Sequence, residues 1–505
     1  MIAASAAVLG VCAVTAAEEA AIQKGAEVKA AEPVAEAVVL EETESSWDFK
    51  AGADFRLRQE IMNNLPGMPG GDPYAMTTTE RAKYRNQFRI RPRVWFEIDN
   101  GPFRLYTRLT DEFRYFPALN AKRHAHPYYF PDEVILDNLY LEASKLELES
   151  LKVFGIESID FRIGRQDMLE RGHSIFGLDR LVAEGTPYDG SRSFYSDMAR
   201  MTLNFDDTKK LDVFALYDSS RNDLSWGTSG SRGRPLAAIN MTDSNDLDEW
   251  GGGLVYSQQA LDGLLPFKLY TMFKRTTKHQ TMRPVVRDRP AKEVTLLGFW
   301  AEPQLLENWT LELEGGRQFG RILDGNRQAG GYMAYTELKY HTPFLKEYKP
   351  VMSAAMTYYS GDRHRTGDDD NDTAWDPMWG RYTQDSEMLV YGTLYENCWW
   401  SNMIYAKAKL TMNFGPHHAM YLYAGPMFAA VQDDLGTRDH DGSMYKGFLS
   451  AMRYDFPILC APKGATGLER FEVFGHVVGE MFHPGDYFDS SRPAYFVRWQ
   501  FDVKF

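Results

Sequence analysis

Apolar and polar side chains alternate with a period of two along the last stretch of the chain, residues 495–505. A transmembrane β-barrel strand of about this length alternates in this way because one side faces lipid and the other a wet lumen. A strand half-buried in a soluble core alternates as well. The apolar face consists of Tyr495, Val497, Trp499, Phe501, Val503 and Phe505, and the other of Phe496, Arg498, Gln500, Asp502 and Lys504. We interpret the stretch as the closing strand of a barrel, with a soluble β-sandwich as the alternative.

The same alternation runs from Trp47 to the carboxyl terminus. In residues 88–98 one phase is apolar from Phe88 to Ile98, and the other carries Arg89, Arg91, Arg93 and Glu97. A tight turn is predicted at 99–101, where the sequence is Asp-Asn-Gly, and residues 103–109 alternate again. Further alternating segments are 49–57, 159–163, 200–205, 267–273, 309–313, 404–412 and 471–477.

The connections between these segments alternate in length. Short turns are predicted at 99–101, 206–209 and 415–417, and long polar connections at 62–83, 167–197, 219–249, 276–292, 361–397 and 431–444. Outer-membrane barrels have this pattern because their periplasmic turns are short and their extracellular loops long, whereas a soluble sandwich has no reason for it. The sequence therefore predicts an all-β, antiparallel transmembrane barrel of about 18 strands in the outer membrane of a Gram-negative-type bacterium.

Three regions are expected along the chain. Residues 1–17 are apolar and small and end in Val-Thr-Ala-Ala, which is typical of a signal peptide, although the usual basic start is missing. Residues 18–46 are rich in Ala, Glu and Val and predict a flexible periplasmic leader. Residues 47–505 form the predicted barrel. Lipid attachment at Cys12 is disfavoured by the large Val11 before it.

Composition narrows the possibilities further. Beyond the first residues there is no apolar run of the roughly 20 residues that a membrane helix needs, and the mean hydropathy of the 505 residues is −0.43. Aromatic residues make up 14%, as expected if two interfacial girdles must be supplied. The net charge of −14 argues against nucleic acid as a partner. Cys398 and Cys460 are expected near opposite ends of the barrel, too far apart for a disulfide.

Four segments resemble the alginate export family of outer-membrane barrels. They are 86–96 (NQFRIRPRVWF), 161–167 (FRIGRQD) continuing to 185–195 (GTPYDGSRSFY), 359–362 (YSGD) with 375–381 (WDPMWGR), and 482–486 (FHPGD). The resemblance implies an 18-stranded, monomeric barrel that exports an anionic polysaccharide through an arginine-rich constriction.

The resemblance also implies roles for single residues. Arg91 and Arg381 match pore-lining arginines of the family, Arg381 on a loop that folds into the lumen, and Arg56 takes the place of a basic residue on the first strand. His476 and Gln500 depart from the pattern, because an arginine and an acidic residue are expected there. These departures put strict alginate selectivity in doubt.

Arginines in the polar phase of the predicted strands are the candidate pore-lining residues. Because arginine stays charged and pairs with carboxylates, a ladder of arginines would favour the passage of anions. The alternative is that they pair with Glu97, Glu112, Asp137, Glu142, Asp160 and Asp167 and stiffen the wall. The full candidate set is Arg56, Arg58, Arg89, Arg91, Arg93, Arg104, Arg108, Arg162, Arg165, Arg200, Arg381, His476 and Arg498, with Arg114 as a further basic residue of the polar phase.

Other chemistry is weakly indicated. Asp368, Asp370 and Asp372 could bind Ca²⁺ in an extracellular loop, but the Gly and terminal Glu of an EF-hand loop are missing. His173 lies near Ser174 and Asp179, yet no nucleophile-elbow pattern surrounds them, so no enzyme is predicted. No other metal site and no cofactor are expected.

The pattern as a whole predicts passive, charge-guided passage, in the outward direction, of an anionic polysaccharide such as alginate. The alternative is a general or substrate-specific porin for small anions or sugars. The expected partners are the transported anion, outer-membrane lipid and lipopolysaccharide, and a periplasmic export partner. The barrel is expected to be a monomer.

Overall fold

The computed structural model describes residues 47–64, 84–115, 128–129, 133–167, 169–170, 173–174, 195–219, 223–227, 239–242, 248–259, 265–277, 291–323, 327–363, 371–379, 386, 388, 401–432, 443–462, 470–487 and 492–505. The predicted signal peptide (1–17) and leader (18–46) lie outside these residues, as does Cys398. Cys460 is exposed in the connection that follows strand β24.

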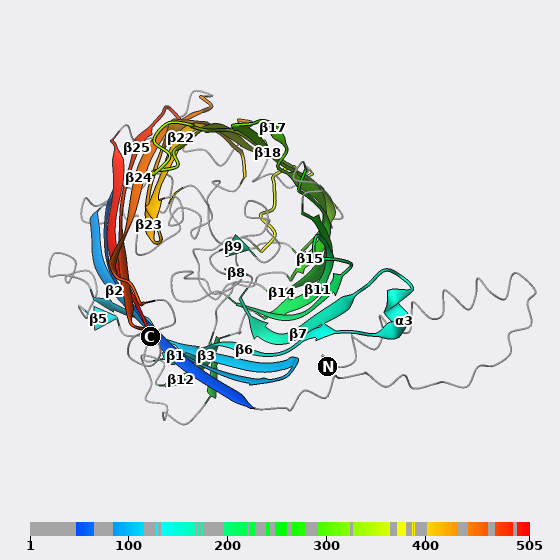
Figure 1. Ribbon diagram of the computed structural model, residues 1–505. Helices are drawn as coiled ribbons and strands as arrows, with labels where there is room; N and C mark the ends of the chain where they lie inside the picture. The colour runs from blue at the N-terminus through cyan, green and yellow to red at the C-terminus, as the bar shows by residue number, and fades with distance from the viewer. Residues whose placement is uncertain are drawn as a thin grey trace, which may run out of the picture. The chain divides into compact units, whose positions relative to one another are not determined.

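Eighteen strands of the described residues form a closed antiparallel barrel (Figure 1). Each pairs with its neighbour, and the last strand, β26 (Ala494–Lys504), pairs with the first, β1 (Asp48–Asn63). Closure leaves no unpaired sheet edge, which a barrel in lipid requires. The strands between them, in wall order, are β2 (Tyr84–Asn100), β3 (Phe103–Thr110), β6 (Glu133–Leu146), β7 (Ser158–Gln166), β10 (Ser196–Asn204), β11 (Lys209–Asp218), β14 (Glu249–Gln258), β15 (Phe267–Thr276), β16 (Lys292–Ala301), β18 (Trp309–Ile322), β20 (Tyr332–His341), β21 (Val351–Tyr359), β22 (Met403–Gly415), β23 (His418–Phe428), β24 (Tyr445–Leu459) and β25 (Glu472–Pro484).

Smaller elements lie in the connections and are not predicted by the alternation. Strand β4 pairs with β2, β12 pairs with β6, and β19 pairs with β18. These elements are β4 (Phe113–Tyr115), β5 (Tyr128–Tyr129), β8 (Leu169–Glu170), β9 (His173–Ser174), β12 (Asp223–Gly227), β13 (Ile239–Thr242), β17 (Gln304–Leu306), β19 (Arg327–Ala329) and the one-turn helix α3 (Glu149–Lys152).

The connections alternate between a short-turn end and a long-loop end, as the sequence predicts. At the short-turn end β2 and β3 form a hairpin in which Asn100 is opposite Phe103. Gly101 has a φ of +57° in this two-residue turn, a conformation that favours glycine. The other short turns occupy 205–208 and 416–417. Long connections, including the one from Tyr359 to Met403, leave the opposite end.

The two faces of the wall are the ones that the alternation predicts. Phe96 is 50% exposed and Leu141 58% exposed on the outward phase, whereas Arg89 and Arg498, on the inward phase, are 2% and 4% exposed. Trp499 is on the outward phase, where its Nε1 donates to Oε1 of Gln59 at 2.8 Å. The apolar faces therefore form the outer surface and the arginines point inward.

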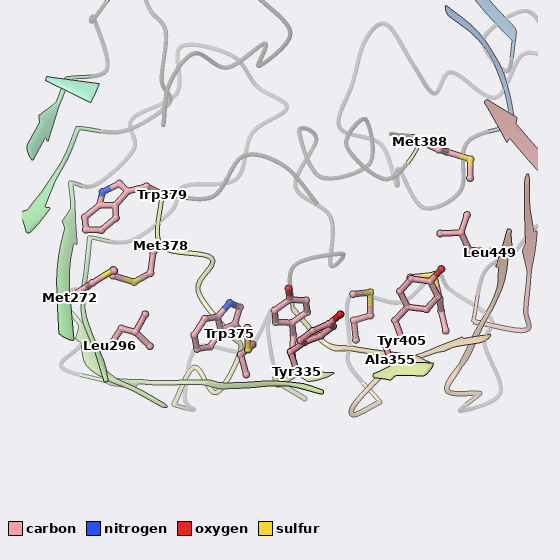
Figure 2. Packing of buried hydrophobic residues seen from close by; sticks show 14 of the residues in the cluster. Met272, Leu296, Tyr335, Ala355, Trp375, Met378, Trp379, Met388, Tyr405 and Leu449 are labelled. Atoms are coloured by element: carbon pink, nitrogen blue, oxygen red, sulfur yellow. The ribbon is translucent and has the colours of Figure 1, made fainter. Parts of the chain in front are cut away.

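A buried apolar cluster lies on the inner side of the wall (Figure 2). Met272 of β15 and Leu296 of β16 are buried there together with Trp375, Met378 and Trp379, which belong to the connection between β21 and β22. The ring of Trp379 meets the ring of Phe214, on β11, edge-on at 5.9 Å between centroids. This long connection therefore folds into the barrel.

Candidate functional site

Arginines of β1 and β2 lie directly opposite one another on the inner wall. In the strand register Arg56 is paired with Arg91, and Arg58 with Arg89. Like charges directly across a strand pair are destabilising. The sequence places them there because both strands carry arginine at every second position. Such a pairing requires carboxylates close by.

Glu60 of β1 supplies one of these carboxylates. Its Oε1 accepts hydrogen bonds from Nε and Nη2 of Arg498 at 3.1 and 2.9 Å and lies 3.1 Å from Nε of Arg58. Its Oε2 accepts from Gln87 at 2.6 Å and lies 3.7 Å from Nη1 of Arg89. Glu60 is fully buried. One carboxylate thus joins β1, β2 and β26.

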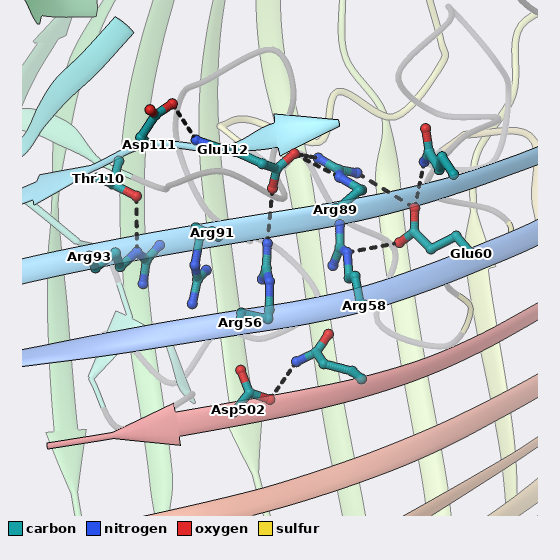
Figure 3. A network of polar contacts seen from close by, with 12 residues as sticks. Arg56, Arg58, Glu60, Arg89, Arg91, Arg93, Thr110, Asp111, Glu112 and Asp502 are labelled. Atoms are coloured by element: carbon teal, nitrogen blue, oxygen red, sulfur yellow. Dashed lines mark hydrogen bonds and ion pairs between the residues drawn. The ribbon is translucent and has the colours of Figure 1, made fainter. Parts of the chain in front are cut away.

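Glu112, which follows β3, supplies the second. It accepts from Nη2 of Arg56 at 3.1 Å and from Nε of Arg89 at 2.7 Å, with a second contact from Nη2 of Arg89 (Figure 3). A buried charge is tolerated when it is paired and hydrogen-bonded in this way. The alternative of wall-stiffening ion pairs therefore holds for the most buried arginines.

Arg91 and Arg93 have longer contacts with carboxylates than Arg89 has. Arg91 contacts Asp54 at 3.2 Å, and Arg93 reaches Oγ1 of Thr110 at 3.4 Å and a carboxylate oxygen of Asp137 at 3.9 Å. Asp137 is shared with Arg108, which lies closer to it. We call the following set the arginine cluster: Arg56, Arg58, Arg89, Arg91, Arg93 and Arg498, with the carboxylates of Asp54, Glu60, Glu112, Asp137 and Asp502 on the same inner face.

Three further arginines, on β3 and β7, lie beside the arginine cluster or between it and the short-turn end. Arg108 contacts Asp137 and Asp167, each at 2.9 Å. Arg104 contacts Asp99 at 2.9 Å, and Arg162 pairs with Glu142. The Arg104 side chain is 38% exposed, so it meets solvent more than the buried cluster does.

Arg165 and Arg200 are buried and paired. Arg165 donates to both carboxylate oxygens of Asp197 at 2.9 and 3.2 Å, and Arg200 contacts Asp212 at 2.9 Å. Arg165 follows the alternating segment 159–163 but still lies within β7, because pairing with β10 continues to Gln166. Both arginines hold neighbouring strands together.

Lysines of β22, on another part of the wall, are functional candidates that the sequence analysis does not name. Lys409 contacts Glu337 at 2.8 Å, and Nζ of the buried Lys407 lies 4.9 Å from the ring centroid of Tyr405. The alternation of 404–412 already put Lys407 and Lys409 on the polar phase.

The segment 371–379 of the β21–β22 connection is fastened to the inner wall by Asp376. Lys274 of β15 contacts its carboxylate, and Lys292 of β16 lies 3.6 Å from it. The side chain of Gln318 donates to the backbone carbonyl of Asp376 at 2.6 Å and accepts from its N–H at 2.9 Å. Burial acts to raise the pKa of Asp376, but the two ammonium groups outweigh it and lower the pKa to about 2. The carboxylate is therefore ionised at neutral pH.

The same connection contacts a second part of the barrel wall, at β25. Oγ of Ser386 and the N–H of Met388 both contact the carboxylate of Glu480 on β25, the latter at 3.0 Å. Trp379 packs on Phe214 of β11. In the strand order β11 and β25 are on opposite sides of the barrel. The connection thus has anchors on both sides of the lumen.

The remaining predicted site residues are placed as follows. His476 is buried on the inward phase of β25, opposite Gln500 of β26. Arg381, Asp368 and Asp370 lie outside the described residues, and the Arg114 side chain is not described either. Asp372 pairs with Lys292 at 2.9 Å. Within the described ranges no three His, Cys, Asp or Glu side chains gather as a metal site would require.

No described helix is long and apolar enough to span a membrane.

No protein-family model and no curated protein matches this chain. The resemblance to the alginate export family is therefore not supported. Among solved structures, the chain is similar to the outer membrane protein opdK from Pseudomonas aeruginosa, with a TM-score of 0.48 and 11% identity over 90% of this chain and 99% of that one. A BenF-like porin from Pseudomonas fluorescens gives a TM-score of 0.48 and 9% identity over 91% and 98%.

The architecture of the barrel wall shows in which membrane environment the protein lies. An antiparallel barrel closed by an even number of strands, apolar outside and charged inside, is the architecture of bacterial outer-membrane proteins. The strand pairing and the exposed apolar surface of this chain meet each of these conditions. The chain is an outer-membrane β-barrel.

Proposed function

We propose that the protein is a substrate-selective porin through which small anions pass passively. The observation that carries this proposal is the gathering of guanidinium groups in the arginine cluster on the inner wall. Fixed cations lower the electrostatic barrier for an anion and raise it for a cation. Arginine is suited to this role because it remains charged at all physiological pH values.

The ion pairs do not remove this selectivity. Carboxylates such as Glu60 and Glu112 reduce the repulsion among arginines and so allow many of them to remain ionised close together. Arg91, Arg93, Arg104 and Arg108 keep part of their surface accessible. We propose that these four meet the passing anion, while the buried arginines set the potential around them.

The anchored β21–β22 connection supports a preference for small solutes. Its described residues 371–379, 386 and 388 contact the inner wall on opposite sides and so take up part of the lumen. Export of a polysaccharide such as alginate is the narrower possibility, in which an extended chain would pass the same arginines. The two proposals differ in the solute that crosses the channel, which is a small anion in one and a polysaccharide chain in the other.

Liposome swelling with matched solutes tests the proposal. Gluconate and sorbitol share a carbon skeleton and differ in charge, so gluconate should enter faster through the wild-type barrel. Arg91→Glu with Arg93→Glu should abolish that preference, whereas Arg321→Glu, on the exposed outward phase of β18, should preserve it. Equal rates for gluconate and sorbitol in the wild type would refute the proposal. Measured passage of a polyuronate chain would favour polysaccharide export.

A further inference from the structure

Three aromatic rings form a row across the inner wall near the short-turn end. Trp95 of β2 stacks on Tyr106 of β3 with 6.2 Å between ring centroids, and Tyr106 stacks on Tyr140 of β6 at 5.1 Å. The planes of each pair are nearly parallel, at 21° and 23°. The Arg162 guanidinium of β7 lies 4.6 Å from the Tyr140 ring centroid. We call Trp95, Tyr106 and Tyr140 the aromatic row.

The aromatic row belongs to the lumen and not to the lipid surface. Trp95 has the same phase as Arg91 and Arg93, and its neighbours Val94 and Phe96 are exposed on the outside. Tyr106 has the phase of Arg104 and Arg108, and Tyr140 is paired with Tyr106 in the register. All three rings are only partly buried, so each keeps surface facing the lumen.

A glycine makes room for the row on β1. Gly52 is opposite Trp95 in the register, on the inward phase. A Cβ atom at Gly52 would lie 2.4 Å from Cζ2 of Trp95, far inside van der Waals contact. The indole therefore lies over bare backbone at this position, a place that a side chain on β1 would otherwise fill.

Charged side chains border the row on both sides. Farther from the short turn are Arg93 and Arg108, two residues from Trp95 and Tyr106 on their strands. Nearer to it, Glu97, Arg104 and Glu142 form an ion-paired group. The result is an apolar strip between two polar belts on one inner surface.

We propose that the aromatic row is a contact site for the pyranose ring of a sugar or sugar acid as it crosses the lumen. A pyranose ring has apolar C–H faces and a rim of hydroxyl or carboxylate groups, which matches an aromatic strip with charged belts beside it. An inorganic anion has no such face and gains nothing from the row. The inference rests on the proposed function and narrows it to ring-bearing solutes.

Block of single-channel current by added solutes tests this inference. The probes are maltohexaose, which is neutral, oligogalacturonate, which is anionic, and inorganic phosphate. In the wild type both oligosaccharides should interrupt the current. In the variant Trp95→Ala with Tyr106→Ala the block by either should weaken about three- to tenfold, a loss of about 0.7–1.4 kcal/mol in binding free energy, because the aromatic contacts to the ring are gone. The response to phosphate should not change.

Two control variants separate ring contact from other effects. Tyr332→Ala removes a ring that stacks on Tyr358 at 5.7 Å on the outward phase, and it should leave the block unchanged. Tyr106→Phe keeps the ring and should keep the block. If the double alanine variant folds poorly, Trp95→Phe combined with Tyr106→Leu gives a milder test with the same expected direction.

The outcomes distinguish this inference from the proposed function. Block by maltohexaose that is unchanged in the alanine variant, or absent from the wild type, would overturn the pyranose site even if the channel prefers anions. Block by maltohexaose that depends on the row in a channel without anion preference would support the site and refute the anion porin.

Discussion

Single carboxylates decide whether the inner wall can hold its arginines. Glu60 is fully buried and contacts Arg58, Arg89 and Arg498. Glu112 performs the same task for Arg56 and Arg89. Removing one partner of a buried ion pair is costly because the other charge stays behind in a poorly solvated place.

Glu60→Gln should therefore destabilise the barrel by about 3–5 kcal/mol. Unfolding in urea from detergent micelles, followed by tryptophan fluorescence, measures this. Glu147→Gln is the matched control, because Glu147 is exposed in the β6–β7 connection and pairs with Lys152 at the surface. That control should change stability by less than about 0.5 kcal/mol. A Glu60→Gln variant as stable as this control would show that the carboxylate is not needed.

At the residue scale, the sequence predicts which arginines face the lumen but not which carboxylates they pair with. Period-two alternation is enough to place Arg89, Arg91 and Arg93 on one face. The pairing of Arg89 with Glu112 depends on how the chain leaves β3, and that of Glu60 with Arg498 joins residues at opposite ends of the chain. No local pattern contains either contact. The lysines Lys407 and Lys409 could have been found by the same alternation.

At the scale of elements, strands and their connections differ in what the sequence reveals. The strands and the alternation of short turns with long loops follow from residue patterns. Only the family resemblance predicts that the β21–β22 connection folds inward. It does so through Arg381, which lies outside the described residues. The contacts that hold it, from Trp379 to Phe214 and from Asp376 to Lys274, are tertiary and have no signature in the sequence.

The Asp376 anchor should depend on pH in a defined direction. Its pKa of about 2 lies below the value near 3.9 of an unfolded aspartate, so the folded state is favoured by ionisation. The stabilisation is complete above about pH 4 and is lost as the pH falls toward 2. The difference in unfolding free energy between wild type and Asp376→Asn should therefore be constant from pH 8 to about 5 and shrink below about pH 4.

The control for this experiment is Asp207→Asn, which changes an exposed carboxylate in the β10–β11 turn. Its stability should follow the wild type at every pH. A difference between wild type and Asp376→Asn that grows on acidification would contradict the assigned role of Asp376, since a depressed pKa can only lose stabilisation as protons are added.

At the scale of the whole molecule, one wall separates two solvents. Aromatic and aliphatic side chains such as Phe96, Leu141 and Val497 cover the outside. Arginines line one part of the inside and lysines another, while the aromatic row interrupts the charged surface near the short-turn end. A net negative chain can therefore carry arginines and lysines on its inner wall.

Ion selectivity of the wild-type barrel in a planar bilayer tests this account most directly. With concentrated KCl on one side and dilute KCl on the other, the potential at zero current reports which ion crosses more easily. A lumen lined by the arginine cluster should give the sign of a chloride-selective channel, and the preference should weaken at high salt as the charges are screened. A potential of the opposite sign, or no potential at all, would contradict the arginine-lined lumen as the origin of function.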